Sequence, residues 1–338
     1  MTEALAPERQ PAFYVTFSGE LDKGGTAPID NIVGFDANGD VSVPAVVGRL
    51  APGLRLHILR GMAFGPDGYL YVANAHRSHS MILCLGPPKP DGTRDMVGTK
   101  PYAHHGRDGV ALVHPYGLVW DRHGHLLVTV QDTVVVTRFT PDRHVGPVAE
   151  FLVEQFRDIP FLPGTHVAGA VDARHLPPAV PVDRGGLLRP RGIAYSDRLH
   201  TIYVADEGVG AVRSYAADTG RFLGDLVDHF PDDGLPIGLH VNGHSDTLYV
   251  GLKKANRILA VDLNDGSVET AVHPKHHGVH LKHPAGIASG NDGALYVASH
   301  QTFQILRYDL EDGSAEVFVD GLPDAPEHII ARPVQQAT

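Results

Sequence analysis

Histidine is the residue type that gives this chain the most scope for chemistry. There are 22 histidines among 338 residues, and many of them stand in polar segments together with Asp, Glu, Lys or Arg. Imidazole can bind a metal as a neutral ligand, or it can accept and donate protons near neutral pH. A histidine in a polar loop is also commonly just solvated, so its position in the fold must decide between these roles.

Four histidines form a candidate metal site. They lie in three segments far apart in the sequence, so they can act together only if the fold gathers these segments around one opening. In that case imidazole ligands favour a zinc-like transition metal over calcium. The expected ligands are His76, His79, His105 and His300.

The elements that would position these residues repeat along the chain. Five segments each combine a glycine at the start of one apolar run with a second run of the Leu-Tyr-Val-Ala type. This pattern predicts a closed ring of four-stranded blades, an all-β six-bladed β-propeller. The five pairs are 60–62 with 69–73, 116–118 with 126–129, 191–193 with 202–205, 237–239 with 248–251, and 285–287 with 295–298.

The two ends of the chain predict the sixth blade. Residues 12–17 match the second strand of the repeat, residues 31–36 the third and residues 41–47 the fourth, but no first strand precedes them. Residues 325–332 supply that missing first strand, with His328 where the other blades have glycine. A blade shared by both ends leaves no open sheet edge. We therefore predict one propeller domain over residues 1–338, closed by residues 12–47 and 325–332.

Two of the sequence spacings between successive repeat glycines are longer than one blade requires. The extra residues predict loop insertions at 100–113 and 157–188, each between the fourth strand of one blade and the first strand of the next. Such loops and those between second and third strands emerge on one face, where we expect the ligand site.

The position just before each repeat glycine should face the central channel. It holds Glu327, Arg60, Tyr116, Arg191, Ile237 and Ala285. Arginine in a channel favours an anionic ligand, so we expect Arg60, Arg191, Tyr116 and His114 to bind substrate. The alternative is that Arg60 and Arg191 pair with Glu327, Asp206 or Glu207. Catalysis is expected from Glu327, His328 and His300, with an acid–base pair as the route that needs no metal.

The composition argues against some classes of binding partner. With 28 Lys and Arg against 39 Asp and Glu, the formal charge is −11, and no basic block stands out, which argues against nucleic acid. No apolar stretch is long enough to span a membrane, and the N-terminal residues do not resemble an export signal, so a cytoplasmic protein is expected. We expect Cys84, the only cysteine in the sequence, to be a buried apolar residue. The sequence leaves the oligomeric state open.

The unit Pro-x-Gly-Ile, Asp-Gly, Leu-Tyr-Val-Ala resembles the NHL repeat and the six-bladed propellers of the regucalcin, gluconolactonase and strictosidine synthase type. It is clearest at 284–287 with 292–298. In regucalcin-like enzymes the pre-glycine position carries Glu, Asn and Asp that hold a divalent ion, and here Glu327 alone fits. Peptidylamidoglycolate lyase, another such propeller, places histidines near that position to hold zinc. In this sequence His328 is the only histidine at a comparable place.

Two functional hypotheses follow. The first is a hydrolase or lyase that acts on a small polar or anionic molecule at the channel mouth, with a His-bound divalent metal as an option and no nucleotide cofactor. The second is a non-catalytic propeller that binds a ligand or a protein. The acidic and basic residues at the expected mouth favour the enzyme.

Overall fold

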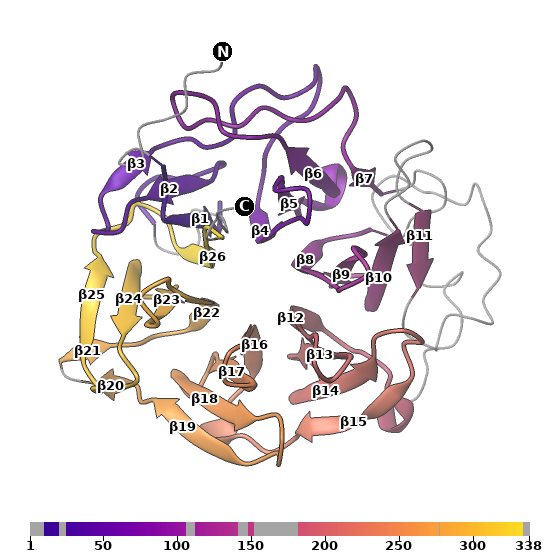
Figure 1. Ribbon diagram of the computed structural model, residues 1–338, viewed down its shortest axis with the longest axis vertical. Helices are drawn as coiled ribbons and strands as arrows, with labels where there is room; N and C mark the ends of the chain where they lie inside the picture. Colours follow the sequence, from indigo (N-terminus) through magenta and orange to yellow (C-terminus); the bar gives the residue numbers. More distant parts are fainter. Residues whose placement is uncertain are drawn as a thin grey trace.

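The computed structural model is a ring of six four-stranded antiparallel sheets around a central channel (Figure 1). It describes residues 10–19, 25–105, 112–140, 148–151, 182–276 and 278–333. Within each sheet the first strand lies at the channel and the fourth at the rim. The all-β six-bladed propeller predicted from the repeat is therefore confirmed. None of the described helices is long and apolar enough to cross a membrane.

Five blades follow one another in the sequence. Blade 1 contains β4 (Leu59–Phe64), β5 (Leu70–Asn74), β6 (Met81–Leu85) and β7 (Ala103–His104), and blade 2 contains β8 (Pro115–Trp120), β9 (Leu126–Val130), β10 (Val135–Thr140) and β11 (Val148–Phe151). Blade 3 contains β12 (Pro190–Ser196), β13 (Thr201–Asp206), β14 (Ala211–Ala216) and β15 (Phe222–Val227). Blade 4 contains β16 (Pro236–Asn242), β17 (Thr247–Leu252), β18 (Arg257–Asp262) and β19 (Val268–Val272). Blade 5 contains β22 (Pro284–Ser289), β23 (Leu295–Ser299), β24 (Gln304–Tyr308) and β25 (Ala315–Val319).

Short elements complete the description. The strands β20 (Lys275–His276) and β21 (Val279–His280) form a hairpin outside the blades. The described residues also include the 3-10 turns η3 (Arg77–His79), η6 (Val182–Arg184) and η7 (Pro231–Asp233).

Blade 6 joins the two ends of the chain, as the terminal half-repeats predict. Its order is β26 (Pro326–Ala331), β1 (Phe13–Phe17), β2 (Val33–Phe35) and β3 (Val41–Val43), with Thr16 opposite His328. The buried Asp324 carboxylate accepts hydrogen bonds from the Ser18 hydroxyl and the Gly19 amide at 2.8 and 2.9 Å, which ties the ends together. The predicted fourth strand, 41–47, is too long, because Pro44 has no amide to continue the ladder.

The core lies between neighbouring blades. Each second and third strand presents alternate apolar side chains to the adjacent sheet, as period-2 strands require. Tyr71 of blade 1 packs in one cluster with Leu126 and Val128 of blade 2, and Tyr249 of blade 4 packs with Leu295 and Val297 of blade 5. This apolar packing holds the inner strands at a fixed spacing around the channel.

The predicted insertions fall mostly on residues that are not described. Residues 106–111 and 152–181 lie outside the described ranges, so the placement of these loops stays a prediction. One boundary needs correction. Residues Ala103 and His104 form β7 and pair with Met81 and Ile82, so this part of the expected 100–113 loop is the fourth strand of blade 1.

The repeat glycines allow the inner strands to approach each other. A Cβ atom on Gly238 would lie 2.3 Å from the carbonyl oxygen of Ala285 in the next blade, whereas one on Gly243 would meet nothing within 4 Å. We expect Gly238→Ala to reduce the free energy of unfolding by about 2–4 kcal/mol, because two packed strands must separate. Urea denaturation checks this against Gly243→Ala. Equal stability of the two variants would contradict it.

Candidate functional site at the channel mouth

Two rings of equivalent positions form the mouth of the channel. One ring is the pre-glycine position, and the other is the first residue after each second strand. In every blade a hydrogen bond connects these segments, as from the amide of Gln131 to the carbonyl of His114 at 3.0 Å. The first ring is Glu327, Arg60, Tyr116, Arg191, Ile237 and Ala285, and the second is Ser18, Ala75, Gln131, Glu207, Lys253 and His300.

Glu327 is the centre of a buried polar cluster drawn from four blades. Its carboxylate lies 3.4 Å from Nη1 of Arg60, 3.2 Å from Nε2 of His300 and 3.4 Å from the hydroxyl of Tyr116. The Arg60, Glu327 and His300 side chains are only 7%, 8% and 7% exposed. Of the residues predicted for catalysis and substrate binding, the fold thus brings together Glu327, His300, Arg60 and Tyr116.

Glu327 is ionised at neutral pH. Burial alone would raise the pKa of this carboxyl group, but Arg60 and the hydrogen bond with His300 outweigh burial and hold the pKa well below its usual range. A permanently ionised carboxylate accepts hydrogen bonds but cannot donate a proton. Glu327 is therefore suited to orient the His300 ring rather than to act as the acid or base itself.

One nitrogen of His300 has no hydrogen-bond partner among the described residues. With Nε2 directed at Glu327, its buried Nδ1 has no hydrogen-bond partner among the described residues. His283 stacks on His300, with ring centroids 4.5 Å apart, and burial together with His300 lowers the pKa of His283 to about 3. Glu327 thus fixes the tautomer of His300 so that Nδ1 is the basic nitrogen.

A second cluster surrounds Glu207. Its carboxylate contacts Nε of Arg191 at 2.7 Å, Nζ of Lys253 at 2.9 Å and Nε of Arg189 at 3.4 Å. Burial would raise the pKa of Glu207, but Arg191 and Lys253 lower it to about 2. The Arg191 guanidinium also donates to the side chain of Gln131.

Tyr116 joins the two clusters. Its ring lies under the Arg191 guanidinium at 4.8 Å, while its hydroxyl reaches Glu327. Burial and then Glu327 raise the pKa of Tyr116, so the phenol stays protonated. The predicted alternative for Arg60 and Arg191, pairing with channel carboxylates, is confirmed. Among the described residues, the four cationic side chains of both clusters form ion pairs with only two carboxylates, those of Glu327 and Glu207.

His328 has a different position from His300. It is the side chain at the place of the repeat glycine and lines the narrow part of the channel with Glu327 and Arg60. Its Nδ1 accepts a hydrogen bond from the amide of Met62 at 3.3 Å, and burial lowers its pKa to about 4. The His328 ring is therefore neutral, and its Nδ1 already accepts a hydrogen bond from the backbone. These properties fit a side chain that packs in the channel rather than one that transfers protons.

The other predicted ligands do not join this cluster. His76 lies near His57, with ring centroids 4.4 Å apart, and both His76 and His79 contact the Ser78 hydroxyl. His105 accepts a hydrogen bond from the amide of Leu112. Nδ1 of His114 is 3.7 Å from Asp132. Among the described residues, His76, His79, His105 and His300 do not place their ligand atoms around one point.

The sequence placed Gln131, Lys253 and His283 on this face without giving them a role, and it gave Glu207 only as a possible partner of the arginines. Three of these four residues share a signal with His300, because Gln131, Glu207 and Lys253 are each the first residue after a second strand of the repeat. That position lies beside the pre-glycine position in every blade.

The pre-glycine ring does not fit a calcium ion. A hard cation requires about six to eight oxygen ligands, and this ring supplies the Glu327 carboxylate and the Tyr116 phenol but also two guanidinium groups. Arg60 already lies against Glu327.

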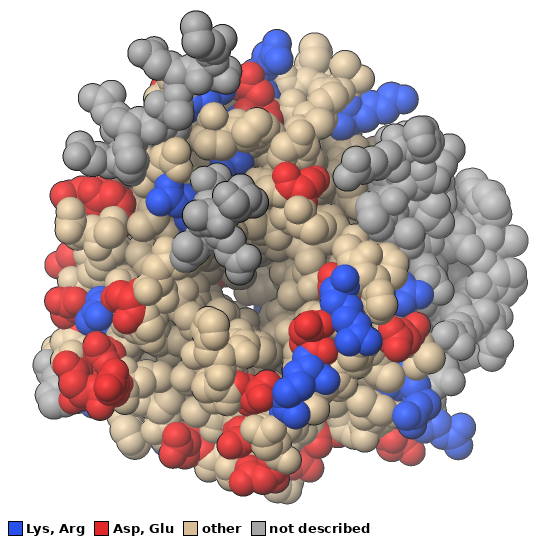
Figure 2. Space-filling model, in the orientation of Figure 1, with Lys and Arg blue, Asp and Glu red and all other residues tan. Residues whose placement is uncertain are grey.

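Figure 2 shows one face of the ring with an opening at its centre, and acidic and basic side chains lie side by side away from that opening. The deeper channel is narrow because its wall is made of inner-strand glycines and the aliphatic side chains beside them. A ligand that meets the charged groups described above would therefore be held at the mouth and not deep inside the ring.

Comparison with known proteins identifies the fold. No protein-family model and no curated protein sequence matches the chain. A chain of the nidogen–laminin complex is similar with a TM-score of 0.61 and 15% identity, covering 94% of this chain and 97% of that chain. Virginiamycin B lyase from Staphylococcus aureus is similar with a TM-score of 0.54 and 12% identity, covering 94% of this chain and 92% of that chain. A putative 6-phosphogluconolactonase from Bacteroides uniformis is similar with a TM-score of 0.53 and 16% identity, covering 97% of this chain and 89% of that chain. At 12–16% identity these similarities support the propeller fold of this chain and nothing finer.

Proposed function

We propose that the channel mouth is the active site of a hydrolase or lyase that acts on a small polar or anionic molecule, with His300 as the general base. The observation that carries this proposal is the buried Glu327–His300 pair, in which Nε2 of His300 is 3.2 Å from the carboxylate and Nδ1 has no partner among the described residues. A carboxylate-oriented imidazole is a common general base, because the carboxylate stabilises the imidazolium that forms.

Either reaction begins with the same proton transfer. In hydrolysis of an ester or lactone, Nδ1 of His300 removes a proton from water while the water oxygen bonds to the carbonyl carbon. The bond from that carbon to the leaving oxygen then breaks, and the imidazolium returns the proton to that oxygen. In an elimination, Nδ1 removes the proton from carbon, and the electron pair of that C–H bond forms a double bond to the neighbouring carbon. The leaving oxygen departs from that neighbouring carbon with the electron pair of its bond and takes the proton from the imidazolium.

The charged groups of the mouth would bind the substrate. Arg189, Arg191 and Lys253 surround Glu207, and Lys253 is 33% exposed, so it can meet a carboxylate or phosphate on the ligand. Tyr116, a protonated phenol between the two clusters, can donate a hydrogen bond to an oxygen that gains negative charge. The lyase and lactonase-like neighbours support this reaction class only at the level of the fold.

Turnover of three probes tests the proposal. Glucono-δ-lactone and 6-phosphoglucono-δ-lactone test hydrolysis, and quinupristin, which was solved with a virginiamycin B lyase, tests elimination. We expect the parent protein to accelerate at least one of these reactions above its spontaneous rate, and His300→Asn to lower kcat by about 10²–10⁴. The exposed His280→Asn is the matched control.

The same assay separates the alternatives. EDTA treatment should leave the rate unchanged, because the Arg60 guanidinium meets Glu327 at the position where a metal ion would lie. A rate lost on EDTA treatment and restored by Zn²⁺ would instead favour a His-bound metal. Acceleration that persists in His300→Asn would contradict the assignment of the base. If no probe turns over but 6-phosphogluconate binds in calorimetry, the chain is better described as a ligand-binding propeller.

A further inference from the structure

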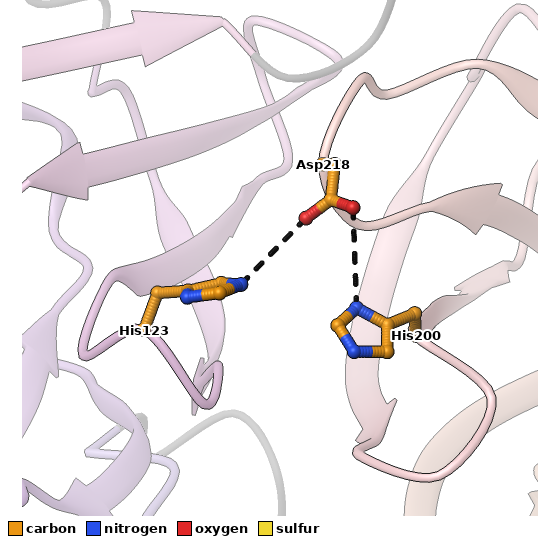
Figure 3. A group of neighbouring side chains, drawn as sticks. All are labelled: His123, His200 and Asp218. Atoms are coloured by element: carbon orange, nitrogen blue, oxygen red, sulfur yellow. Dashed lines mark ion pairs between the residues drawn. The ribbon is translucent and has the colours of Figure 1, made fainter.

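A second group of chemistry-bearing side chains lies at the opposite end of the inner strands from the mouth. His123 is in the turn between β8 and β9, His200 in the turn between β12 and β13, and Asp218 in the turn between β14 and β15. These turns connect first with second strands or third with fourth strands, so they emerge on the face away from the Glu327 cluster. Figure 3 shows the three side chains directed toward one another across the junction of blades 2 and 3.

Their ligand atoms surround a common point. Nε2 of His123 is 3.8 Å from Oδ1 of Asp218, and Nδ1 of His200 is 4.0 Å from Oδ2. These separations are too long for hydrogen bonds. They are close to the roughly 3.4 Å between ligand atoms around a tetrahedral ion with bonds of about 2.0–2.1 Å. Small side-chain rotations would bring all three atoms into the coordination sphere of one ion.

The backbone of each turn is fixed before any ion binds. Asp121 is buried and accepts hydrogen bonds from the amides of His123 and His125 at 2.9 and 2.8 Å. The amide of Ala217, next to Asp218, donates to the carbonyl of His200 at 3.0 Å. Such preorganisation reduces the conformational entropy lost when a ligand binds.

The accessible atoms are the ligating ones. The side chains of His123 and Asp218 are 51% and 66% exposed, and His200 is 22% exposed. Nε2 of His200 is buried and has no partner among the described residues, so Nδ1, which faces Asp218, is the nitrogen that an ion can reach. Among the described residues, these three are the one group of at least three His, Cys, Asp or Glu that converges in this way.

We propose that His123, His200 and Asp218 bind a divalent transition-metal ion, with Zn²⁺ favoured, and that the ion links blade 2 to blade 3. Two imidazoles and one carboxylate select zinc-like ions over calcium or magnesium, which prefer sites made of oxygen. Three protein ligands leave at least one position for water. The proposal is independent of the reaction at the mouth, since it uses other residues on the other face.

Calorimetry on EDTA-treated, tag-free protein tests the site directly. Titration with ZnCl₂ is expected to give one site of micromolar Kd, and saturation should raise the apparent Tm by roughly 4 °C, since an ion that binds only the folded state stabilises it. His123→Ala, Asp218→Asn and His200→Asn should each raise Kd at least tenfold. Asparagine is used at position 200 because the backbone φ there is 52°, which Asn tolerates better than most residues.

The control must separate this site from the many other histidines. His244→Ala removes an exposed histidine from the equivalent turn of blade 4, where the amide of His244 donates to Asn242 as that of His123 donates to Asp121. Zinc binding should survive in this control and in His76→Ala. The visible absorption of bound Co²⁺ should disappear in His123→Ala. A zinc Kd weaker than about 1 mM, or one unchanged in His123→Ala, would overturn the proposal.

Discussion

A chain that ends at Leu322 is expected to lose its cooperative thermal transition or to melt at a far lower temperature. The deletion removes β26, which is the inner strand of blade 6 and pairs with β1 at five positions from Phe13 to Phe17. It also removes Ile329, which is fully buried in the core between blades 5 and 6, and Asp324, which holds Ser18 and Gly19. The inner edge of β1 would be left unpaired at the channel.

Circular dichroism and differential scanning calorimetry check this prediction. A chain that ends at Pro333 keeps all of β26 and serves as the control. Ile329→Ala tests the same contact in a variant that should still fold, with an expected loss of about 2–5 kcal/mol in the free energy of unfolding. An unchanged Tm after deletion from residue 323 would mean that the closing blade does not need this strand.

Acid should destabilise the folded state well before the carboxylates are protonated. Burial lowers the pKa of His240 to about 4, of His283 to about 3 and of His328 to about 4. The unfolded chain binds a proton at each of these histidines near pH 6.5, whereas the folded protein does not. Stability is therefore complete above pH 6.5 and falls as the pH drops toward 4. Each site contributes roughly 3 kcal/mol over this interval, and three together approach the whole stability of a typical domain.

His328→Asn isolates one of these contributions. Asparagine keeps an acceptor for the amide of Met62 but does not titrate, so the slope of unfolding free energy against pH should decrease by about 1.4 kcal/mol per pH unit between pH 6 and 5. Glu327, with its lowered pKa, stabilises the fold above pH 4.5 and loses that effect only at lower pH, outside this window. Urea titrations at several pH values measure the slope. The control is His229→Asn, whose side chain is 95% exposed; equal slopes in both variants would rule out a buried, neutral His328.

The position of the candidate site was partly predictable because the repeat fixes the register. Once the glycines are aligned, Glu327, Arg60, Tyr116 and Arg191 occupy one equivalent position, and six blades in a closed ring must direct that position to the channel. Glu207, which follows a second strand, was expected only as a possible partner of the arginines, and Lys253, at the equivalent position of the next blade, was not assigned a role.

The contact between Tyr116 and Glu327 was not predictable. Tyr116 and Glu327 are separated by 211 residues in the sequence, and no local pattern states that the phenol reaches that carboxylate. The predicted set of His76, His79, His105 and His300 was based on a shared face. A shared face of a propeller is wide, and His76 lies with His57 while His300 lies on Glu327.

The sequence by itself determined the six blades, the closure by both ends and the residues that face the channel, because strand period and glycine spacing are local properties that repeat. The tertiary structure alone decided which of the two expected roles the channel arginines take, and that Glu327 is ionised while Nδ1 of His300 has no hydrogen-bond partner among the described residues. It also decided that His123, His200 and Asp218 meet on the far face. Those outcomes depend on distances of a few ångströms between blades and on the burial of each group, which are set only when the whole ring has closed.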